Sequence, residues 1–311
     1  MSGRYAPSPS GPLHLGNLRT ALLAWLQARL AGQPFILRME DLDLPRIKAG
    51  SSEQILKELR WLGLDWDQGP DCGGPASPYE QSARTPFYQQ ALEQLLKQDL
   101  IYPCYCSRKD IQQAASAPHS HEYGSIYPGT CRDPEQRAEM KQHHPDKTAA
   151  WRYRVPTRTI EFTDRIIGEV SQSLDREVGD FVIKRADGLF AYQLAVVVDD
   201  GMMGITDVVR GADLLDSTAR QIELFEALGY PIPTFWHVPL MMDSSGARLS
   251  KRDGSDSLEV WHQQGRNAAA LIGYLAFSVG LIDVEQPISA PALLQKLTLE
   301  LFQDKLTTLN T

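Results

Sequence analysis

The chain has 311 residues, of which 42% are hydrophobic and 23% are charged, a composition that is ordinary for a globular enzyme of one large or two smaller domains. The formal net charge of −8 argues against sequence-blind binding of nucleic acid, which depends on lysine and arginine side chains. No apolar run approaches the ~20 residues of a membrane span, and no secretory signal is evident, so we expect a cytoplasmic protein.

The first part of the chain alternates between strand and helix patterns. Residues 3–8 predict a short strand that runs into a Pro/Ser/Gly loop, and residues 17–32 predict a helix with one apolar face and a glycine stop. Residues 34–40 predict a buried strand. Residues 51–64 predict a second helix, with Ser51 in position for a capping box. This alternation is typical of a parallel α/β sheet.

The middle of the chain interrupts the alternation. Residues 79–98 have a helical period, and residues 101–150 then contain clustered cysteines and a polar stretch, which we interpret as an insertion between the two halves of the sheet. Residues 180–200 predict a β-hairpin around Ala-Asp-Gly. Residues 217–230 predict a helix with Ser217 as its N-cap.

These elements predict a domain organisation. We expect a Rossmann-like, doubly wound parallel sheet in a catalytic domain over residues 1–256, with the insertion at about residues 101–150. The remainder has a helical pattern, which predicts a short helical C-terminal domain over residues 257–311.

Two short motifs indicate the chemistry. The sequence HLGN, residues 14–17, lies at the start of the first predicted helix, where unpaired amides and partial positive charge favour a phosphate. His14 can donate to phosphates, and Gly16 lets the backbone approach closely. Far downstream, the loop ARLSKRDG carries Lys251, which can close over a leaving pyrophosphate. We therefore expect a nucleotide, accompanied by Mg²⁺.

Three of the four cysteines, Cys104, Cys106 and Cys131, lie close together in the predicted insertion and point to a metal in a reducing compartment. Tetrahedral zinc requires a fourth ligand. The candidates for it are His119, His121, Tyr127, His143 and His144. General ligand preference favours a histidine, and the alternative to a metal site is three unconnected thiols.

Longer segments resemble a known family, the catalytic domain of the class I glutamyl-tRNA synthetases. The resemblance covers roughly residues 3–253 and rests on the segments RYAPSPSGPLHLGNLRTALLAWLQAR, RMEDLD, YEQSART, FAYQLAVVVDD and DVVRGADLL. Class I synthetases hold ATP between an HxGx motif and a downstream SK loop. The resemblance therefore implies a Rossmann-like fold, and ATP and L-glutamate as substrates with Mg²⁺. We also expect a monomer.

The resemblance also implies roles for individual residues. Free glutamate carries two carboxylates and an ammonium, so its pocket needs arginine forks and an acid. The implied glutamate site comprises Arg4 and Arg210 as forks, Glu40 as the ammonium partner, Tyr192 as a phenol donor, and Ala6 and Ser8. The implied ATP site comprises His14, Gly16, Asn17 and Lys251, with His14, Gly16 and Lys251 as the catalytic residues.

The chain departs from full-length glutamyl-tRNA synthetases after the Lys251 loop. About 55 residues follow, with Arg266, Lys296 and Lys305 as their basic residues, too few for an anticodon-binding extension. Pro45 and the CYC and YPGTC segments resemble instead the truncated paralogues, the glutamyl-Q tRNA(Asp) synthetases. Those ligases activate glutamate without tRNA and esterify it to queuosine in the anticodon of tRNA-Asp.

The paralogue family also uses a tyrosine shortly before the last cysteine as a metal ligand. The resemblance thus implies one structural zinc per chain, held by Cys104, Cys106, Tyr127 and Cys131. Two other functions stay open at this point. One is a synthetase that charges the 3′ end of tRNA-Glu, and the other is a tRNA-binding relic without catalysis.

Overall fold

A computed structural model describes residues 1–115, 126–242, 258, 261 and 264–308. Its central sheet has four parallel strands in the order β2-β1-β8-β9. The strands are β1 (Gly3–Tyr5), β2 (Phe35–Leu37), β8 (Asp207–Gly211) and β9 (Thr234–Val238). The first strand lies between one strand from its own half of the chain and one from the later half. In such a doubly wound sheet, ligands bind outside the carboxyl ends of the strands where the order reverses.

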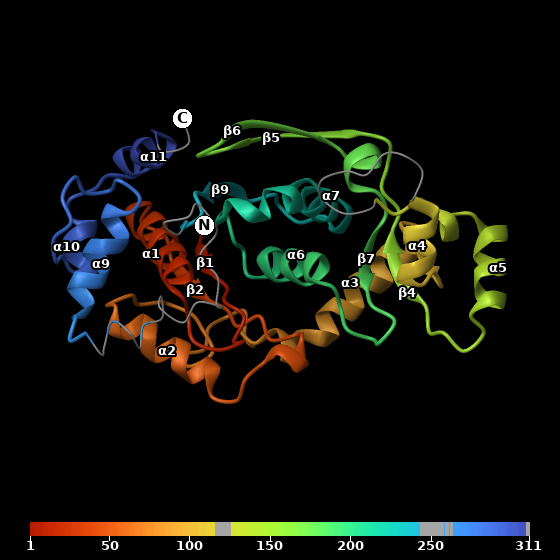
Figure 1. Cartoon of the computed structure of the whole chain (residues 1–311), viewed down its shortest axis with the longest axis horizontal. Helices are drawn as coiled ribbons and strands as arrows, with labels where there is room; N and C mark the ends of the chain where they lie inside the picture. Colours follow the sequence, from red (N-terminus) through yellow and green to blue (C-terminus); the bar gives the residue numbers. More distant parts are fainter. Residues whose placement is uncertain (116–125, 243–257, 259–260, 262–263, 309–311) are drawn as a thin grey trace.

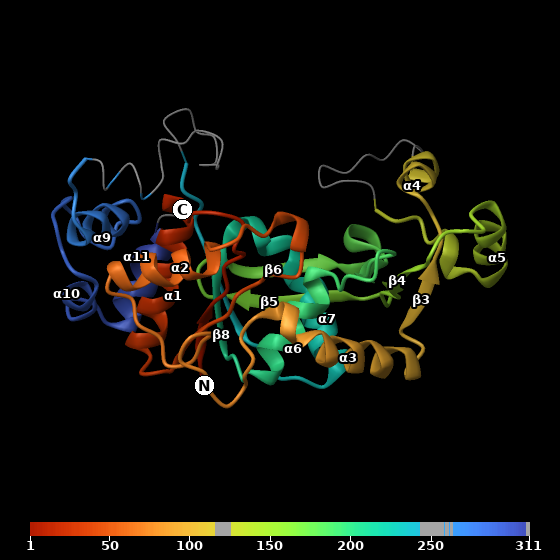
Figure 2. The same ribbon diagram turned by 90° about the horizontal axis from the view of Figure 1, so that it is seen from below.

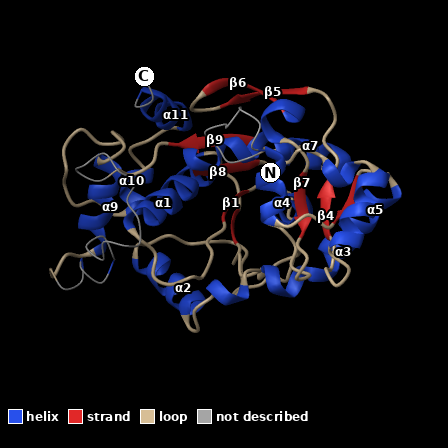
Figure 3. Ribbon diagram, turned by 45° about the vertical axis from the view of Figure 1, so that its right-hand side comes forward, coloured by secondary structure: helices blue, strands red, loops and turns tan. Residues whose placement is uncertain are grey.

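Alternate residues of each strand point to opposite faces of the sheet, and both faces are covered. Val209 and Trp236 pack with the apolar cluster of α1, whereas Val208 and Phe235 pack with the cluster of α3, α6 and α7. Figure 3 shows these strands enclosed between helices. The helices are α1 (Leu15–Leu30), α2 (Ser51–Trp61), α3 (Thr85–Lys97), α6 (Tyr192–Met202) and α7 (Thr218–Leu228), joined by the short 3-10 helices η1 (Leu44–Arg46), η2 (Gln81–Arg84) and η5 (Ala212–Ser217).

The two ends of the molecule differ in secondary structure. At one end the C-terminal helices α9 (Ala268–Phe277), α10 (Ala290–Leu294) and α11 (Leu299–Thr308) pack against α1 (Figure 2). At the other end lies an antiparallel sheet in the order β3-β4-β7 with α4 and α5 beside it. The elements there are β3 (Ile101–Cys104), α4 (Arg108–Ala115), η3 (Thr130–Arg132), α5 (Pro134–His143), β4 (Ala150–Tyr153) and β7 (Phe181–Lys184).

A long hairpin runs between these two ends. It consists of β5 (Thr159–Asp164) and β6 (Gly168–Ser173), is followed by the π-helical turn η4 (Leu174–Val178), and lies along the outside of the parallel sheet near β9 (Figure 1). Within the described ranges, no helix is both long and apolar enough to cross a membrane.

The β-hairpin expected over residues 180–200 is wrong in its second half. The turn is present, with Gly188 at φ +91° and a bridge between Lys184 and Phe190, but the residues that follow form α6 rather than a strand. The run Val196–Val198 has strand propensity, yet all of it is buried in a helix that contacts α3 and α7. Burial on all sides overrides the weak preference of β-branched residues for strands.

Two expected helix caps also differ in detail. Gly50, with φ +77°, precedes the first residue of α2, so Ser51 is inside the helix rather than its cap. Ser217 is the N-cap residue of α7 as expected, but its hydroxyl accepts from Gln193 and caps no backbone amide. The stop expected at Gly32 is confirmed, since α1 ends at Leu30 and Gly32 has φ +64°.

Candidate functional site

A pocket of about 440 Å³ opens at the carboxyl ends of β1 and β8, beside the N-terminus of α1. This is the position at which a doubly wound sheet binds its ligands. The pocket is lined by every residue of the implied glutamate site and by the described residues of the implied ATP site, namely Arg4, Ala6, Ser8, His14, Gly16, Asn17, Glu40, Tyr192 and Arg210. Lys251 lies outside the described residues.

The start of α1 orients His14 into this pocket. His14 is the N-cap residue, and its Nδ1 accepts a hydrogen bond from the backbone N–H of Asn17 at 3.3 Å. Because Nδ1 is an acceptor, the proton of the neutral ring is on Nε2, which is then a donor. A Cβ at Gly16 would lie 3.1 Å from the His14 ring. Any larger residue at position 16 would crowd the imidazole, so glycine allows the His14 ring to lie at the N-terminus of the helix.

Two arginines, Arg4 and Arg210, place positive charge in the pocket, although both are almost fully buried. The Nε of Arg4 lies 3.4 Å from both carboxylate oxygens of Asp200. Arg210 is held differently, because it donates to uncharged acceptors: Nε2 of His237 at 2.9 Å, Oε1 of Gln221 at 2.6 Å and Oγ1 of Thr218 at 2.8 Å. Burial lowers the pKa of Arg210 from its ordinary value, so a bound anion would relieve an electrostatic cost.

Glu40 supplies an acid to the pocket. Its backbone N–H donates to the carbonyl of Pro7, which ties the end of β2 to the loop after β1. Its carboxylate accepts from Arg38 at 3.2 Å. Burial raises the pKa of Glu40, although Arg38 and Arg4 act in the opposite direction. A ligand ammonium beside this carboxylate would favour its charged form. Tyr192, the first residue of α6, is 37% exposed and lines the same space.

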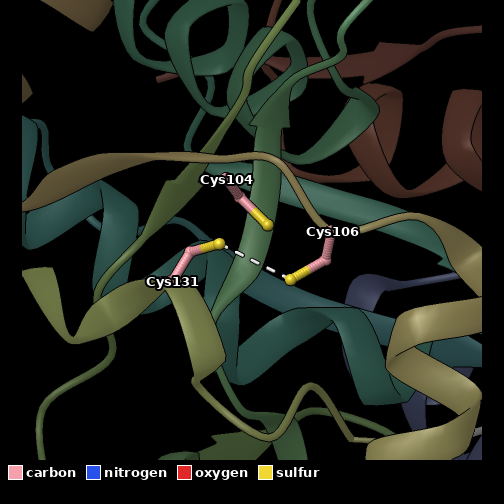
Figure 4. A group of neighbouring side chains, drawn as sticks. All are labelled: Cys104, Cys106 and Cys131. Atoms are coloured by element: carbon pink, nitrogen blue, oxygen red, sulfur yellow. Dashed lines mark hydrogen bonds between the residues drawn. The ribbon is translucent and has the colours of Figure 1, made fainter. Parts of the chain in front are cut away.

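The cysteines of the antiparallel end form a second site, shown in Figure 4. The sulfur atoms of Cys104, Cys106 and Cys131 all lie within 4.8 Å of one another. The Oη atom of Tyr127 lies 3.4 Å from the Cys104 sulfur and 3.5 Å from the Cys106 sulfur. The Arg152 guanidinium stacks on the Tyr127 ring, with its Cζ 3.8 Å from the ring centroid. Three thiols and a phenol therefore converge as four donors, the number that a tetrahedral zinc requires.

None of the described contacts brings a candidate histidine to the cysteines as the fourth ligand. His119 and His121 lie outside the described residues. His144 contacts Asp110 instead, with Nε2 at 2.9 Å from its carboxylate. Among the described histidine, cysteine, aspartate and glutamate side chains, the three cysteines alone form a group that could hold a metal at this end.

A family model described as tRNA synthetases class I (E and Q), catalytic domain, matches residues 1–286. The chain belongs to this class I synthetase family. The glutamyl-Q tRNA(Asp) synthetase of Symbiobacterium thermophilum is 51% identical over 93% of this chain and 89% of its own length. Membership of this group of class I synthetases makes the chain a ligase.

Longer relatives are similar as well. A glutamate–tRNA ligase of a Sulfurihydrogenibium species is 43% identical over 88% of this chain, which matches 57% of that ligase. The crystal structure of a glutamate-tRNA synthetase from Elizabethkingia anophelis superposes with a TM-score of 0.82 at 31% identity. That match covers 96% of this chain, which spans 66% of the solved chain. The Rossmann-like, class I synthetase fold expected from the sequence is confirmed.

A buried charge network behind the pocket of this class I synthetase was missed by sequence reasoning. Arg38 donates to Asp200 at 2.7 Å and lies 3.6 Å from Asp199, and all three side chains are nearly inaccessible. Asp200 also contacts Arg4, so the network joins a pocket residue to the core. The only sequence signal is the pair of acids that ends the apolar run of FAYQLAVVVDD, since a buried apolar helix has no reason to end in two carboxylates unless they are paired.

Proposed function

We propose that this ligase activates L-glutamate with ATP in the absence of tRNA and transfers the glutamyl group to the queuosine base in the anticodon of tRNA-Asp. The observation that carries the amino-acid assignment is Arg210, a buried cation on uncharged acceptors that lines an open pocket. Such a group favours a carboxylate ligand, and a guanidinium can bind one through two parallel hydrogen bonds.

In the proposed glutamate site, each charged group of the amino acid has a side chain of opposite charge. Arg210 and Arg4 bind the carboxylates, and Glu40 binds the ammonium. The remaining glutamate residues, Ala6, Ser8 and Tyr192, complete the wall. One carboxylate must stay near the nucleotide, because its oxygen attacks the α-phosphorus of ATP while the bond to the bridging oxygen of pyrophosphate breaks.

The nucleotide site supplies donors to the charge that develops in this step. His14, Gly16 and Asn17 present a ring N–H and a helix N-terminus to the phosphates. Lys251 meets the negative charge on the departing pyrophosphate. Mg²⁺ accompanies ATP and neutralises part of the polyphosphate charge.

The assignment of the acceptor is supported by the similarity to the Symbiobacterium protein, which carries that name and is matched over nearly all of its length. A second candidate, charging of tRNA-Glu, is supported by the similarity to the Sulfurihydrogenibium ligase. The catalytic pocket serves both candidates equally, so the acceptor must be determined by experiment.

Domain organisation, zinc, compartment and assembly belong to the same proposal. The catalytic domain comprises residues 1–256 with its zinc-bearing insertion at 101–150, and the helical C-terminal domain comprises residues 257–311. Zinc held by Cys104, Cys106, Tyr127 and Cys131 would close the insertion as a structural centre without an open position. The ligase acts as a monomer in the cytoplasm, a compartment that keeps such thiols reduced.

The first expected result concerns the amino-acid step. The purified wild type should catalyse glutamate-dependent exchange of pyrophosphate into ATP with no tRNA added. Lys251→Ala should reduce this exchange on the order of a hundredfold or more, because a charge-stabilising group is lost. Lys97→Ala, which removes an exposed lysine in the last turn of α3, is the matched control and should leave it unchanged. A wild type without exchange contradicts the proposal, and normal exchange in Lys251→Ala contradicts the role of that lysine.

The second expected result concerns the metal. Elemental analysis of the purified chain should find one zinc, and Cys104→Ser should lose most of it, because three remaining donors hold zinc weakly. Cys72→Ser changes an exposed cysteine and should retain the metal. Tyr127→Phe should lower zinc affinity as well. Retention of zinc in Tyr127→Phe, with loss in a double replacement of His119 and His121, would assign the fourth ligand to a histidine.

A further inference from the structure

The guanidinium of Arg210 donates to His237, which in turn contacts Asp164. Neither the motifs nor the proposed reaction gives these two residues a role. His237, on β9, accepts the Nε–H of Arg210 at Nε2 over 2.9 Å. On the other edge of the same ring, Nδ1 lies 2.6 Å from Oδ2 of Asp164, the last residue of β5. His237 and Asp164 are 0% and 1% exposed. The three side chains therefore form one buried chain, Asp164–His237–Arg210, that ends at the pocket.

The contacts fix where the protons lie in this chain. An arginine nitrogen can only donate, so Nε2 of His237 must present its lone pair, and the ring proton must be on Nδ1. Nδ1–H then donates to the carboxylate of Asp164. Protonation of Nε2 would replace the acceptor with a second donor and place a positive ring beside a positive guanidinium. The geometry is thus consistent with a neutral His237 only.

Asp164 is itself fixed by the backbone. Its Oδ1 accepts from the N–H groups of Ile166 at 2.9 Å and Ile167 at 3.0 Å, and both oxygens accept from the backbone N–H of His237. Burial acts to raise the pKa of Asp164, but the hydrogen bond from the His237 ring, together with those from the Ile167 and Ile166 amides, outweighs it and holds the pKa below its ordinary value. Asp164 is therefore a charged anchor that attaches the turn of the β5–β6 hairpin to β9.

The surroundings of His237 keep its ring neutral. The charged groups that face it are Asp164 from β5, Arg210 from β8 and Asp213 from η5, while α7 contributes the uncharged Thr218, whose Oγ1 is 3.2 Å from Nε2. Burial lowers the pKa of His237 below the ordinary 6.5, and Arg210 lowers it further, against the opposing influence of Asp164 and Asp213.

We propose that Asp164 and His237 are positioning residues that orient Arg210 for the carboxylate of the amino-acid substrate. This inference rests on the proposed function, in which Arg210 binds glutamate. Asp164 fixes the tautomer of His237, and His237 holds the Nε edge of the guanidinium, as Gln221 and Thr218 hold its two terminal nitrogens. These acceptors of Arg210 are uncharged and do not neutralise it. Its positive charge is therefore available to the carboxylate of the ligand. The arrangement selects an amino acid with a side-chain carboxylate over its amide.

The test compares two replacements of His237 that separate its two hydrogen bonds. Asparagine reaches only the position of Nδ1, so His237→Asn keeps a donor to Asp164 and loses the acceptor for Arg210. Glutamine reaches the position of Nε2, so His237→Gln keeps an acceptor for Arg210. In tRNA-free pyrophosphate exchange, His237→Asn should raise the KM for glutamate by about ten- to a hundredfold, as expected for a buried donor without its partner, with smaller changes in kcat and in the KM for ATP. His237→Gln should restore most of the glutamate KM.

A neighbouring residue provides the control for simple destabilisation. Trp236 is on the same strand, but its side chain points to the opposite face and packs in the cluster of α1. Trp236→Phe should lower thermal stability without raising the KM for glutamate. A folded His237→Asn with an unchanged glutamate KM overturns the proposal, as does an equal rise in Trp236→Phe. If His237→Asn does not fold, Asp164→Asn replaces it, and an unchanged glutamate KM there overturns the proposal as well.

The pH dependence of the KM for glutamate is a second test, because a purely structural role of His237 would not alter it. Because the pKa of His237 is below its ordinary value, the ring should protonate only at a more acidic pH than a free histidine, and the glutamate KM of the wild type should rise there. His237→Gln has no ring to protonate and should lack this rise. Identical profiles in the two proteins contradict the proposal. A wild type without glutamate-dependent exchange removes the proposed function itself, whereas normal exchange with an unaffected His237→Asn removes only this inference.

Discussion

Replacement of Asp199 by alanine should lower the free energy of unfolding by about 3–5 kcal/mol, the cost of leaving a buried cation without its partner. Asp199 is fully buried and accepts from Arg84 at 2.6 Å, from Gln81 at 2.8 Å and from the Tyr88 hydroxyl at 2.9 Å. Arg38 lies 3.6 Å away on its other side. Alanine would remove the hydrogen-bond acceptor of Arg84 and an ion-pair partner of Arg38, two side chains that are themselves 1% and 0% exposed.

Urea unfolding followed by tryptophan fluorescence measures this change. Asp283→Ala removes the acid of a surface ion pair, in which the aspartate side chain is 92% exposed, and should leave the midpoint unchanged. Asp199→Asn retains the shape and one acceptor oxygen, so its loss should fall between the two. A loss for Asp199→Ala no larger than for Asp283→Ala would mean that water or a rearranged partner replaces the carboxylate, and that the network does not stabilise the core.

The network also explains why the pocket can hold two arginines side by side. Asp200 contacts both Arg38 and Arg4 and remains charged, because these arginines lower its pKa against the opposing effect of burial. Arg4 therefore has an anionic neighbour, whereas Arg210 has none among its described hydrogen-bond acceptors. Asp200 also acts electrostatically on Arg210, but the hydrogen bonds that hold the Arg210 guanidinium go to uncharged residues, so these residues determine its orientation toward a ligand.

Much of the fold was predictable because its signals are local. The period of α1, the glycine that follows it and the apolar strand of β2 are each contained in one short segment, and each was placed correctly. Local signals failed at α6, where three consecutive valines have strand propensity but complete burial stabilises a helix. The pocket beside His14 was predictable for a different reason, since HLGN is recognisable as a motif without knowledge of the fold, whereas the SK loop lies outside the described residues.

The residues behind the pocket could not be predicted in this way. Arg38 and Asp200 are 162 residues apart, and Asp164 and His237 are 73 residues apart. Arg38 meets Asp200 because the end of β2 lies beside α6 in the fold, and Asp164 meets His237 because the β5–β6 hairpin lies against β9. Arg38, Asp164 and His237 each have the pattern of an ordinary charged or polar position, and the acids after the apolar run of FAYQLAVVVDD indicate a buried partner without identifying it. At the metal site the cysteine cluster was evident from the residues themselves, whereas Tyr127 was expected only through the resemblance to the paralogue family, since general ligand preference favours a histidine.

The acceptor experiment has the largest expected effect, because its result is all or none. Glutamate should be transferred to tRNA-Asp that contains queuosine and not to tRNA-Asp with guanosine at the same place. The terminal ribose of a tRNA carries a cis-diol, and queuosine carries another on its cyclopentene ring. The same adenylate could therefore be attacked by either hydroxyl pair, and the pocket around Arg210, Glu40 and His14 does not distinguish them.

The position of the transferred glutamate decides between the two ends of the tRNA. After transfer of labelled glutamate, ribonuclease cleavage should release the label on an anticodon fragment. Unmodified tRNA-Asp and tRNA-Glu are the matched acceptors, and Lys251→Ala is the control for dependence on the adenylate. Label on the 3′-terminal adenosine, or preference for tRNA-Glu, would instead establish a tRNA-Glu synthetase. Because pyrophosphate exchange is measured without any tRNA, that outcome would change the acceptor and leave the assignment of glutamate activation intact.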